Sequence, residues 1–144
     1  MKYIQLVKAS AWYDLIVTAP FALPFTAKLT VELMAQIDQS MNLGGYVPTF
    51  EPFHFIFTNL LGSLVIIWSV IRIRHSHAVM GLYDAICRMF FASLMMYYLF
   101  LYQATPVIYF FLIPELLWGI AQFWGYFGSD ESKRNQGAAL QRVI

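Results

Sequence analysis

Three long runs of hydrophobic residues dominate the chain. They cover residues 53–73, 79–102 and 105–127, and each contains at most two charged residues. A helix needs roughly 20 mostly apolar residues to cross the hydrocarbon core of a bilayer. The three runs therefore predict three transmembrane helices.

A fourth hydrophobic segment covers residues 9–25, and its pattern is weaker. It is shorter, carries Asp14, and contains Pro20 and Pro24, which should break or bend the helix. An even number of crossings fits the distribution of charges better than an odd one. The sequence thus predicts an all-α integral membrane protein, with a four-transmembrane-helix bundle over residues 1–128 and a polar cytoplasmic tail over 129–144.

Between the first two predicted spans, residues 27–41 show the pattern of an amphipathic helix. Leu29, Leu33, Ile37 and Met41 recur every four residues, with polar side chains off that stripe. This helix either continues the first span past its prolines or lies flat on the outer leaflet. By contrast, the third and fourth spans are joined by a minimal connection, which predicts that they are antiparallel neighbours.

The composition supports the membrane assignment. Hydrophobic residues make up 60% of the 144 residues, and charged residues make up 12%, against about 25% in soluble domains. The net charge of +1 creates no field that would attract nucleic acid. Cys87 is the single cysteine, which excludes an intrachain disulfide and a paired-cysteine metal site.

Positive charges gather on one side of the four predicted crossings. The opposite side carries Lys28 alone, beside Glu32, Asp38 and Glu51. Because positively charged flanks stay on the cytoplasmic side, both termini should face the cytoplasm, in a cytoplasmic (inner) membrane. Trp12, Trp68 and Trp124 should form an aromatic belt at the same boundary. The cations on the cytoplasmic side are Lys2, Lys8, Arg72, Arg74, Lys133, Arg134 and Arg142.

Short matching phrases indicate an internal repeat. The first span contains Tyr13-Asp14 and the third contains Tyr83-Asp84, while Asn59 and Glu115 each precede a pair of leucines in the second and fourth spans. These matches predict two parallel helical hairpins related by an axis along the membrane normal. Chance is the competing explanation, because short identities arise easily in apolar sequence.

Four charged residues lie well inside the predicted spans, where charge is costly and usually faces the bundle interior: Asp14, Asp84, Arg88 and Glu115. Asp84 and Arg88 are four residues apart, a spacing that suits an ion pair on one helix face. Asp14 lies at a similar depth and could share the guanidinium of Arg88. The three form either a polar cluster that binds a head group or relays protons, or a structural clamp between helices.

Glu115 stands apart because no cation lies near it in the sequence. Pro114 precedes it and should kink the helix, since it leaves the carbonyl of Phe110 without a donor. Asn59, about two turns into the second span, is the expected partner. The pair is either a ligand-recognition or proton-accepting site, or a hydrogen bond that holds two helices together.

No catalytic motif and no glycine-rich phosphate-binding loop appears, so nothing in the sequence supports an enzyme. Two functions remain. In the first, the bundle binds or moves a small amphipathic or hydrophobic molecule in an intramembrane polar cavity lined by the four charged residues and Asn59. In the second, it is a non-catalytic accessory or assembly subunit of a larger membrane complex. The first is preferred, because a scaffold gains little from an isolated Glu115. No cofactor is predicted, although a bound lipid or quinone fits the first function, and the expected partners are the bilayer, other membrane proteins or a second copy.

Overall fold

The computed structural model describes residues 2–45 and 47–129, and within them every regular element is a helix. Met1, Tyr46 and residues 130–144, which include nearly all of the predicted tail, lie outside the described residues. The elements, in which η marks a short 3-10 helix, are α1 (Tyr3–Thr18), η1 (Ala19–Phe21), α2 (Pro24–Ser40), α3 (Pro52–Arg74), α4 (Ala78–Leu101), η2 (Pro106–Ile108) and α5 (Tyr109–Phe127).

Among the described residues, three segments are each long and apolar enough to cross a membrane: α3, α4 and the segment Pro106–Phe127, which joins η2 to α5. Both α3 and α4 begin and end within one residue of the predicted ranges. The hydroxyl of Thr105 accepts a hydrogen bond from the N–H of Val107 at 3.2 Å and so caps η2. α5 continues as an α-helix through Pro114, so the proline does not interrupt it.

The first helix differs from the predicted range of 9–25, because α1 begins at Tyr3 and ends at Thr18. Leu23 is extended (φ −112°, ψ 141°), the conformation that a following proline favours, and α2 then starts at Pro24. The segment Tyr3–Phe21 meets α2 at a bend of 96°. The prolines therefore end the first helix early, and α1 with η1 measures roughly 30 Å, close to the thickness of the hydrocarbon core.

α2 covers the predicted amphipathic segment, and its apolar stripe faces away from the bundle. Leu29 and Leu33 are 64% and 55% exposed. The buried residues of α2 are Ala27 and Asp38, and Asp38 accepts a hydrogen bond from the hydroxyl of Thr105. One end of α2 is thus tied to the α4–α5 connection, while its apolar stripe remains uncovered.

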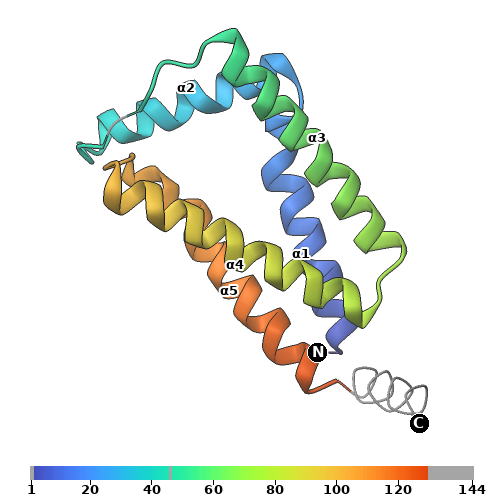
Figure 1. Cartoon of the computed structure of the whole chain (residues 1–144). Coiled ribbons are helices and arrows are strands. Elements are labelled where there is room, and N and C mark those ends of the chain that lie inside the picture. Colours follow the sequence, from blue (N-terminus) through green and yellow to red (C-terminus); the bar gives the residue numbers. More distant parts are fainter. Residues whose placement is uncertain (1, 46, 130–144) are drawn as a thin grey trace.

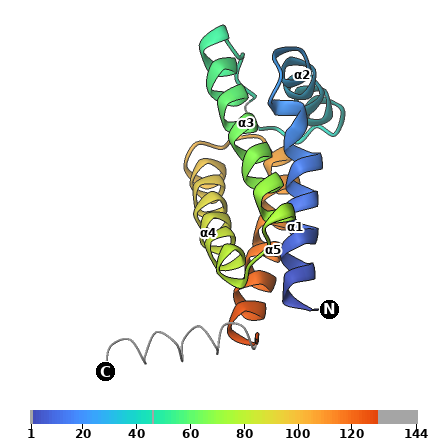
Figure 2. The same cartoon turned by 90° about the vertical axis from the view of Figure 1, so that its right-hand side faces the viewer.

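The four helices α1, α3, α4 and α5, which we call the bundle helices, form two antiparallel pairs, α1 with α3 and α4 with α5 (Figure 1). The pairs come together near the N-terminus and separate toward the other end, which α2 crosses from η1 to η2 (Figures 1 and 2). We call this the α2 end. Three ring contacts join α1 and η1 to α5 along their length: Tyr3–Tyr126, Tyr13–Trp118 and Phe21–Phe111.

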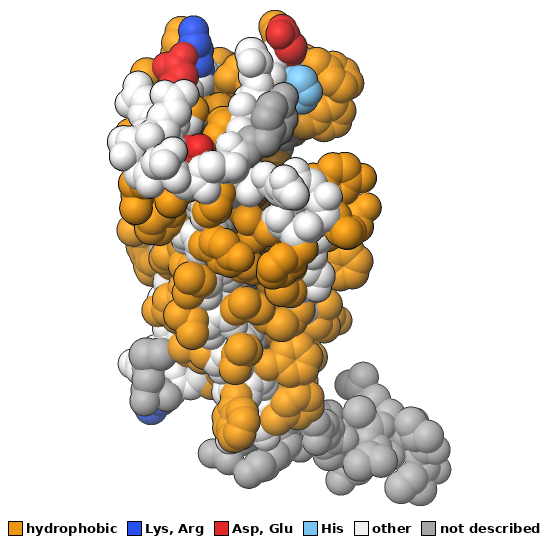
Figure 3. Space-filling view, turned by 90° about the vertical axis from the view of Figure 1, so that its left-hand side faces the viewer, with side chains coloured by type: hydrophobic (Ala, Val, Ile, Leu, Met, Phe, Trp, Pro, Cys, Tyr) orange, Lys and Arg blue, Asp and Glu red, His pale blue; other side chains and the backbone are white. Residues whose placement is uncertain are grey.

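Hydrophobic side chains cover the outside of the helices, whereas large polar side chains are buried inside. Figure 3 shows hydrophobic side chains over the middle of one face and most of the charged side chains gathered at the α2 end. The largest fully buried side chains are those of Arg72, Arg88 and Gln122. This distribution reverses that of a soluble protein, in which such residues are rarely buried.

Gly62 allows α3 to approach the break that follows α1. A Cβ at this position would lie 2.7 Å from backbone atoms of both Phe21 and Ala22, which is too close for any side chain. We expect Gly62→Ala to lower the free energy of unfolding by about 1–3 kcal/mol through overpacking, measured by thermal unfolding in mild detergent. The control is Gly128→Ala, whose Cβ would meet no atom closer than 3.6 Å. Equal stability of the two variants would contradict this packing.

Candidate functional site

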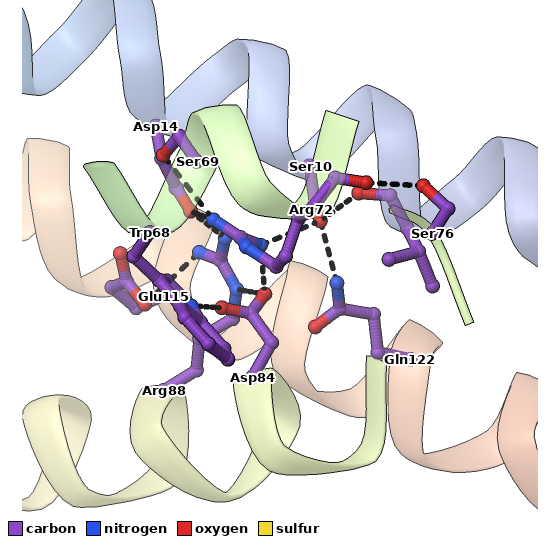
Figure 4. Close-up of polar contacts among 11 residues, drawn as sticks. Ser10, Asp14, Trp68, Ser69, Arg72, Ser76, Asp84, Arg88, Glu115 and Gln122 are labelled. Atoms are coloured by element: carbon purple, nitrogen blue, oxygen red, sulfur yellow. Dashed lines mark hydrogen bonds and ion pairs between the residues drawn. The ribbon is translucent and has the colours of Figure 1, made fainter. Parts of the chain in front are cut away.

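Two arginines lie in the bundle interior with almost no exposure. Arg72, near the end of α3, is 0% exposed, and Arg88, on α4, is 2% exposed. Asp14 from α1 and Asp84 from α4 are buried beside them, and Glu115 from α5 lies next to Arg88 (Figure 4). Each of the helices α1, α3, α4 and α5 therefore supplies at least one charged group to a single cluster.

The two aspartates and the two arginines form a closed circle of ion pairs, which we call the charge ring. Asp14 Oδ2 accepts from Nη2 of Arg72 and from Nη2 of Arg88. Asp84 Oδ2 accepts from Nη1 of Arg72 and, at 2.9 Å, from Nε of Arg88. Each carboxylate bridges both guanidiniums, so the ring is neutral when all four groups are ionised. Such pairing and hydrogen bonding is what makes buried charge tolerable.

Glu115 attaches to the charge ring as a fifth charged group. Its Oε2 accepts from Nη1 of Arg88 at 3.0 Å, and its Oε1 has no hydrogen-bond partner among the described residues. Its side chain is 16% exposed, against 11% for Asp14 and 4% for Asp84. Because the ring is already neutral, an ionised Glu115 gives the cluster one uncompensated negative charge.

Neutral polar side chains extend the hydrogen bonding of the ring. Trp68 Nε1 donates to Asp84 Oδ1 at 3.1 Å, while Ser10 Oγ accepts from Arg72 Nη1 at 3.3 Å and from Gln122 Nε2. Within the described part of the chain, the buried atoms without a partner are Arg72 Nε, Gln122 Oε1 and the hydroxyl of Tyr3. Figure 4 shows the Gln122 amide oxygen on the side that faces Asp84.

The structure brings four of the five sequence-predicted site residues together and separates the fifth. The predicted Asp84–Arg88 ion pair is confirmed, as is the sharing of Arg88 by Asp14. Asn59 is not the partner of Glu115, because its Nδ2 donates to the carbonyl of Phe21 at 2.8 Å. There it satisfies a carbonyl in the proline-broken segment, while the long side chain of Arg88 reaches Glu115 instead.

Two residues that the sequence assigned to the cytoplasmic boundary lie at the site. Arg72 is a buried member of the charge ring, and the indole of Trp68 donates to Asp84. Polar spacing within each helix could have revealed this site. Ser10 precedes Asp14 by four residues, Ser69 precedes Arg72 by three, and Gln122 follows Glu115 by seven. These intervals place side chains on one face of a helix.

Two grooves on the described surface are lined by apolar side chains. One, of about 400 Å³, lies between the end of α2 and α5, from Met41 and Leu43 to Pro114. The other, of about 570 Å³, lies between α4 and α5 around Gly119 and Trp124. The polar groups, by contrast, are packed against one another, so the expected polar cavity takes the form of a compact cluster beside apolar grooves.

The cluster can form ion pairs and hydrogen bonds, and it contains one carboxyl, that of Glu115, beyond the four groups of the neutral charge ring. Among the described residues, no group of three or more His, Cys, Asp or Glu could hold a metal ion.

No protein-family model matches the chain, and no curated protein or solved structure is significantly similar to it.

Proposed function

We propose that the protein is integral to a membrane and crosses it four times, through α1 with η1, α3, α4 and α5. The three longest segments have the required length and hydropathy, and α1 with η1 has nearly the required length. Leucine and phenylalanine side chains on the outside and arginines on the inside suit a hydrocarbon environment.

Both termini are proposed to face the cytoplasm, on the inner side of a cytoplasmic membrane. Arg72 no longer counts as a flanking charge, because it is buried in the charge ring. Lys2, Lys8 and Arg74 support this orientation, against Lys28 alone at the α2 end. Three further cations, Lys133, Arg134 and Arg142, lie outside the described residues.

In this orientation α2 lies along the outer interface. A helix bent by 96° from a crossing helix runs close to the membrane plane. The exposed stripe of Leu29 and Leu33 would then enter the acyl region, while Lys28 and Glu32 stay in the head-group layer.

The two-hairpin repeat is part of this proposal. The pairs α1–α3 and α4–α5 are both antiparallel, and Asp14 and Asp84, from the matching Tyr-Asp phrases, both bridge the two arginines. The other matching phrase has diverged in role, because Asn59 bonds a backbone carbonyl whereas Glu115 bonds Arg88.

We propose that the bundle binds or moves a small amphipathic molecule, with its head group at Glu115 and its apolar part in the groove that ends at Pro114. The observation that carries this proposal is the surplus carboxyl. A clamp between helices requires only the four groups of the neutral charge ring, and a further ionisable group inside the membrane is costly without a function. The isolation of Glu115, which favoured this function in the sequence, no longer supports it because Arg88 is its partner.

Glu115→Gln tests the proposed binding site. The amide keeps the size of the side chain and can still accept from Arg88, and the charge ring stays neutral. We expect the purified variant to lose most of the co-purifying lipid or quinone, by about tenfold, while its stability changes by less than about 1 kcal/mol. Extraction with mass spectrometry measures the bound molecule, and thermal unfolding measures stability.

The matched control for this test is Glu32→Gln, at an exposed pair on α2. It should keep the bound molecule and the stability of the wild type. Wild-type ligand content in Glu115→Gln would refute the role of Glu115.

The alternative function, an accessory or assembly subunit, is favoured by the groove between α4 and α5. Trp124 is 82% exposed beside it and Ile120 is 56% exposed, so a helix of a partner would cover apolar surface there. Purification in mild detergent separates the two functions. A stable stoichiometric complex with other membrane proteins, and no bound small molecule, supports the subunit function.

A further inference from the structure

We propose that the ligand of the Glu115 site carries a positively charged amine head group, as a protonated amine or a quaternary ammonium on an apolar body. This inference rests on the proposed binding function and names the class of molecule that the site would take. It follows from the charge balance of the cluster, the supply of hydrogen-bond donors, and the aromatic residues beside Glu115.

The charge balance favours a cation. Asp14 and Asp84 are matched by Arg72 and Arg88 in a closed ring, so an ionised Glu115 adds a negative charge that no further cation of the cluster matches. A single positive charge on the ligand brings the cluster to neutrality. A neutral head group would leave the imbalance, and an anionic one would double it in a medium where unpaired charge is strongly penalised.

The guanidiniums that an anionic head group would need are buried, and their terminal nitrogens already bond to carboxylates. Arg88 donates through Nε, Nη1 and Nη2 to three different carboxylates. Arg72 donates through both terminal nitrogens to Asp14 and Asp84, and only its fully buried Nε lacks a partner. An accessible acceptor remains instead, because Glu115 Oε1 is unbonded among the described residues and the Glu115 side chain is the most exposed of the three acidic side chains in the cluster.

A second acceptor lies unpartnered farther along the same helix. Gln122, which is fully buried, follows Glu115 by two turns, and its Oε1 lacks a donor within the described chain. In Figure 4 this oxygen lies on the side of the amide nearer Asp84. This acceptor is buried, so the acceptor that a head group can reach is Glu115 Oε1, on the most exposed carboxyl of the cluster.

An aromatic pair stands beside the carboxyl. The rings of Tyr13 and Trp118 lie 6.1 Å apart at 45°, and both side chains are partly buried. Trp118 follows Glu115 by three residues on α5, which places the two side chains on one face of the helix, and Tyr13 precedes Asp14 on α1. Aromatic faces next to a carboxylate are the recurrent means of recognising ammonium groups, with tryptophan the strongest partner.

The test compares three ligands with the same decyl chain: decyltrimethylammonium, its uncharged carbon isostere and decyl sulfate. Binding is measured on the full chain in lipid nanodiscs, and partitioning into empty nanodiscs is subtracted. We expect the ammonium to bind the wild type about tenfold more tightly than the uncharged isostere, through its attraction to the carboxylate and the aromatic faces. We expect decyl sulfate to bind most weakly.

Two variants and their controls assign this preference to the site. Glu115→Gln should bind the ammonium no better than the isostere, and Trp118→Leu should reduce the preference severalfold. Glu32→Gln and Trp124→Leu, at exposed positions on α2 and α5, should keep it.

The outcomes separate this inference from the function on which it rests. Saturable binding of the isostere or the sulfate as tightly as the ammonium overturns the amine assignment and leaves a binding function standing. An ammonium preference that survives Glu115→Gln also overturns it. Absence of saturable binding by all three ligands, together with no co-purifying molecule, overturns the binding function itself.

Discussion

Arg72→Ala should destabilise the protein by about 3–5 kcal/mol, the usual cost of leaving buried charge without its partner. The substitution removes donors from Asp14 and Asp84 at once and opens the charge ring. Neither carboxylate can turn to solvent, because their side chains are 11% and 4% exposed. The effect is measured as a lower midpoint of thermal unfolding, or of unfolding in sodium dodecyl sulfate, for protein purified in mild detergent.

Two further variants show whether the loss comes from the charge ring. Arg74→Ala removes an exposed arginine two residues along the same helix, and it should leave the midpoint unchanged. Adding Asp14→Asn to Arg72→Ala should recover part of the lost stability, because the double variant has the charge balance of the wild type. If Arg72→Ala is as stable as Arg74→Ala, Arg72 is not a member of the ring.

Asp84→Ala should also destabilise the protein by about 3–5 kcal/mol, because it breaks the buried ion pairs with both arginines. Asp84 accepts from Arg72, Arg88 and the indole of Trp68, so its loss leaves Arg72 with Asp14, and Arg88 with Asp14 and Glu115. The Trp68 indole also loses its acceptor, and we expect a change in tryptophan fluorescence with the lower midpoint. The exposed acid on α2, tested as Glu32→Ala, should change neither property.

Asp84→Ala also makes Glu115 important for stability. Without Asp84, the carboxyls of Asp14 and Glu115 together balance the two arginines. The charge of Glu115, which is surplus in the wild type, is then needed to keep the cluster neutral. Glu115→Gln should therefore be mild in the wild type and strongly destabilising in the Asp84→Ala background, a non-additivity expected of residues in one network. Additive effects of the two substitutions would contradict the charge count.

The helices that sequence reasoning placed within one residue are those with a continuous apolar run. α3 and α4 have this pattern, and each ends where the run ends. The first helix was misplaced because the predicted range of 9–25 ran through both prolines, whereas α1 ends at Thr18, before the first of them. Pro24 forces Leu23 into an extended conformation, so the apolar residues beyond it belong to α2.

The candidate site was predicted in part, and the successes were local. Asp84 and Arg88 are one helical turn apart, so their pairing follows from the geometry of a single helix. The pairing of Glu115 was missed because Arg88 reaches it from another helix, 27 residues away in the sequence. Asn59 was misassigned for the same reason, since its partner lies 38 residues away in η1.

The sequence by itself determined the all-helical architecture, the positions of the long apolar helices and the amphipathic character of α2, because each depends on the type and spacing of nearby residues. Only the tertiary structure decided which charges meet. The sequence predicts Arg72 to be a flanking cation, because mean hydropathy is an average over neighbouring residues and does not depend on the direction of one long side chain. Packing of α1, α3 and α4 turns that side chain inward, where it joins carboxylates 58 and 12 residues away. That closure makes the ring neutral and leaves Glu115 as the surplus charge.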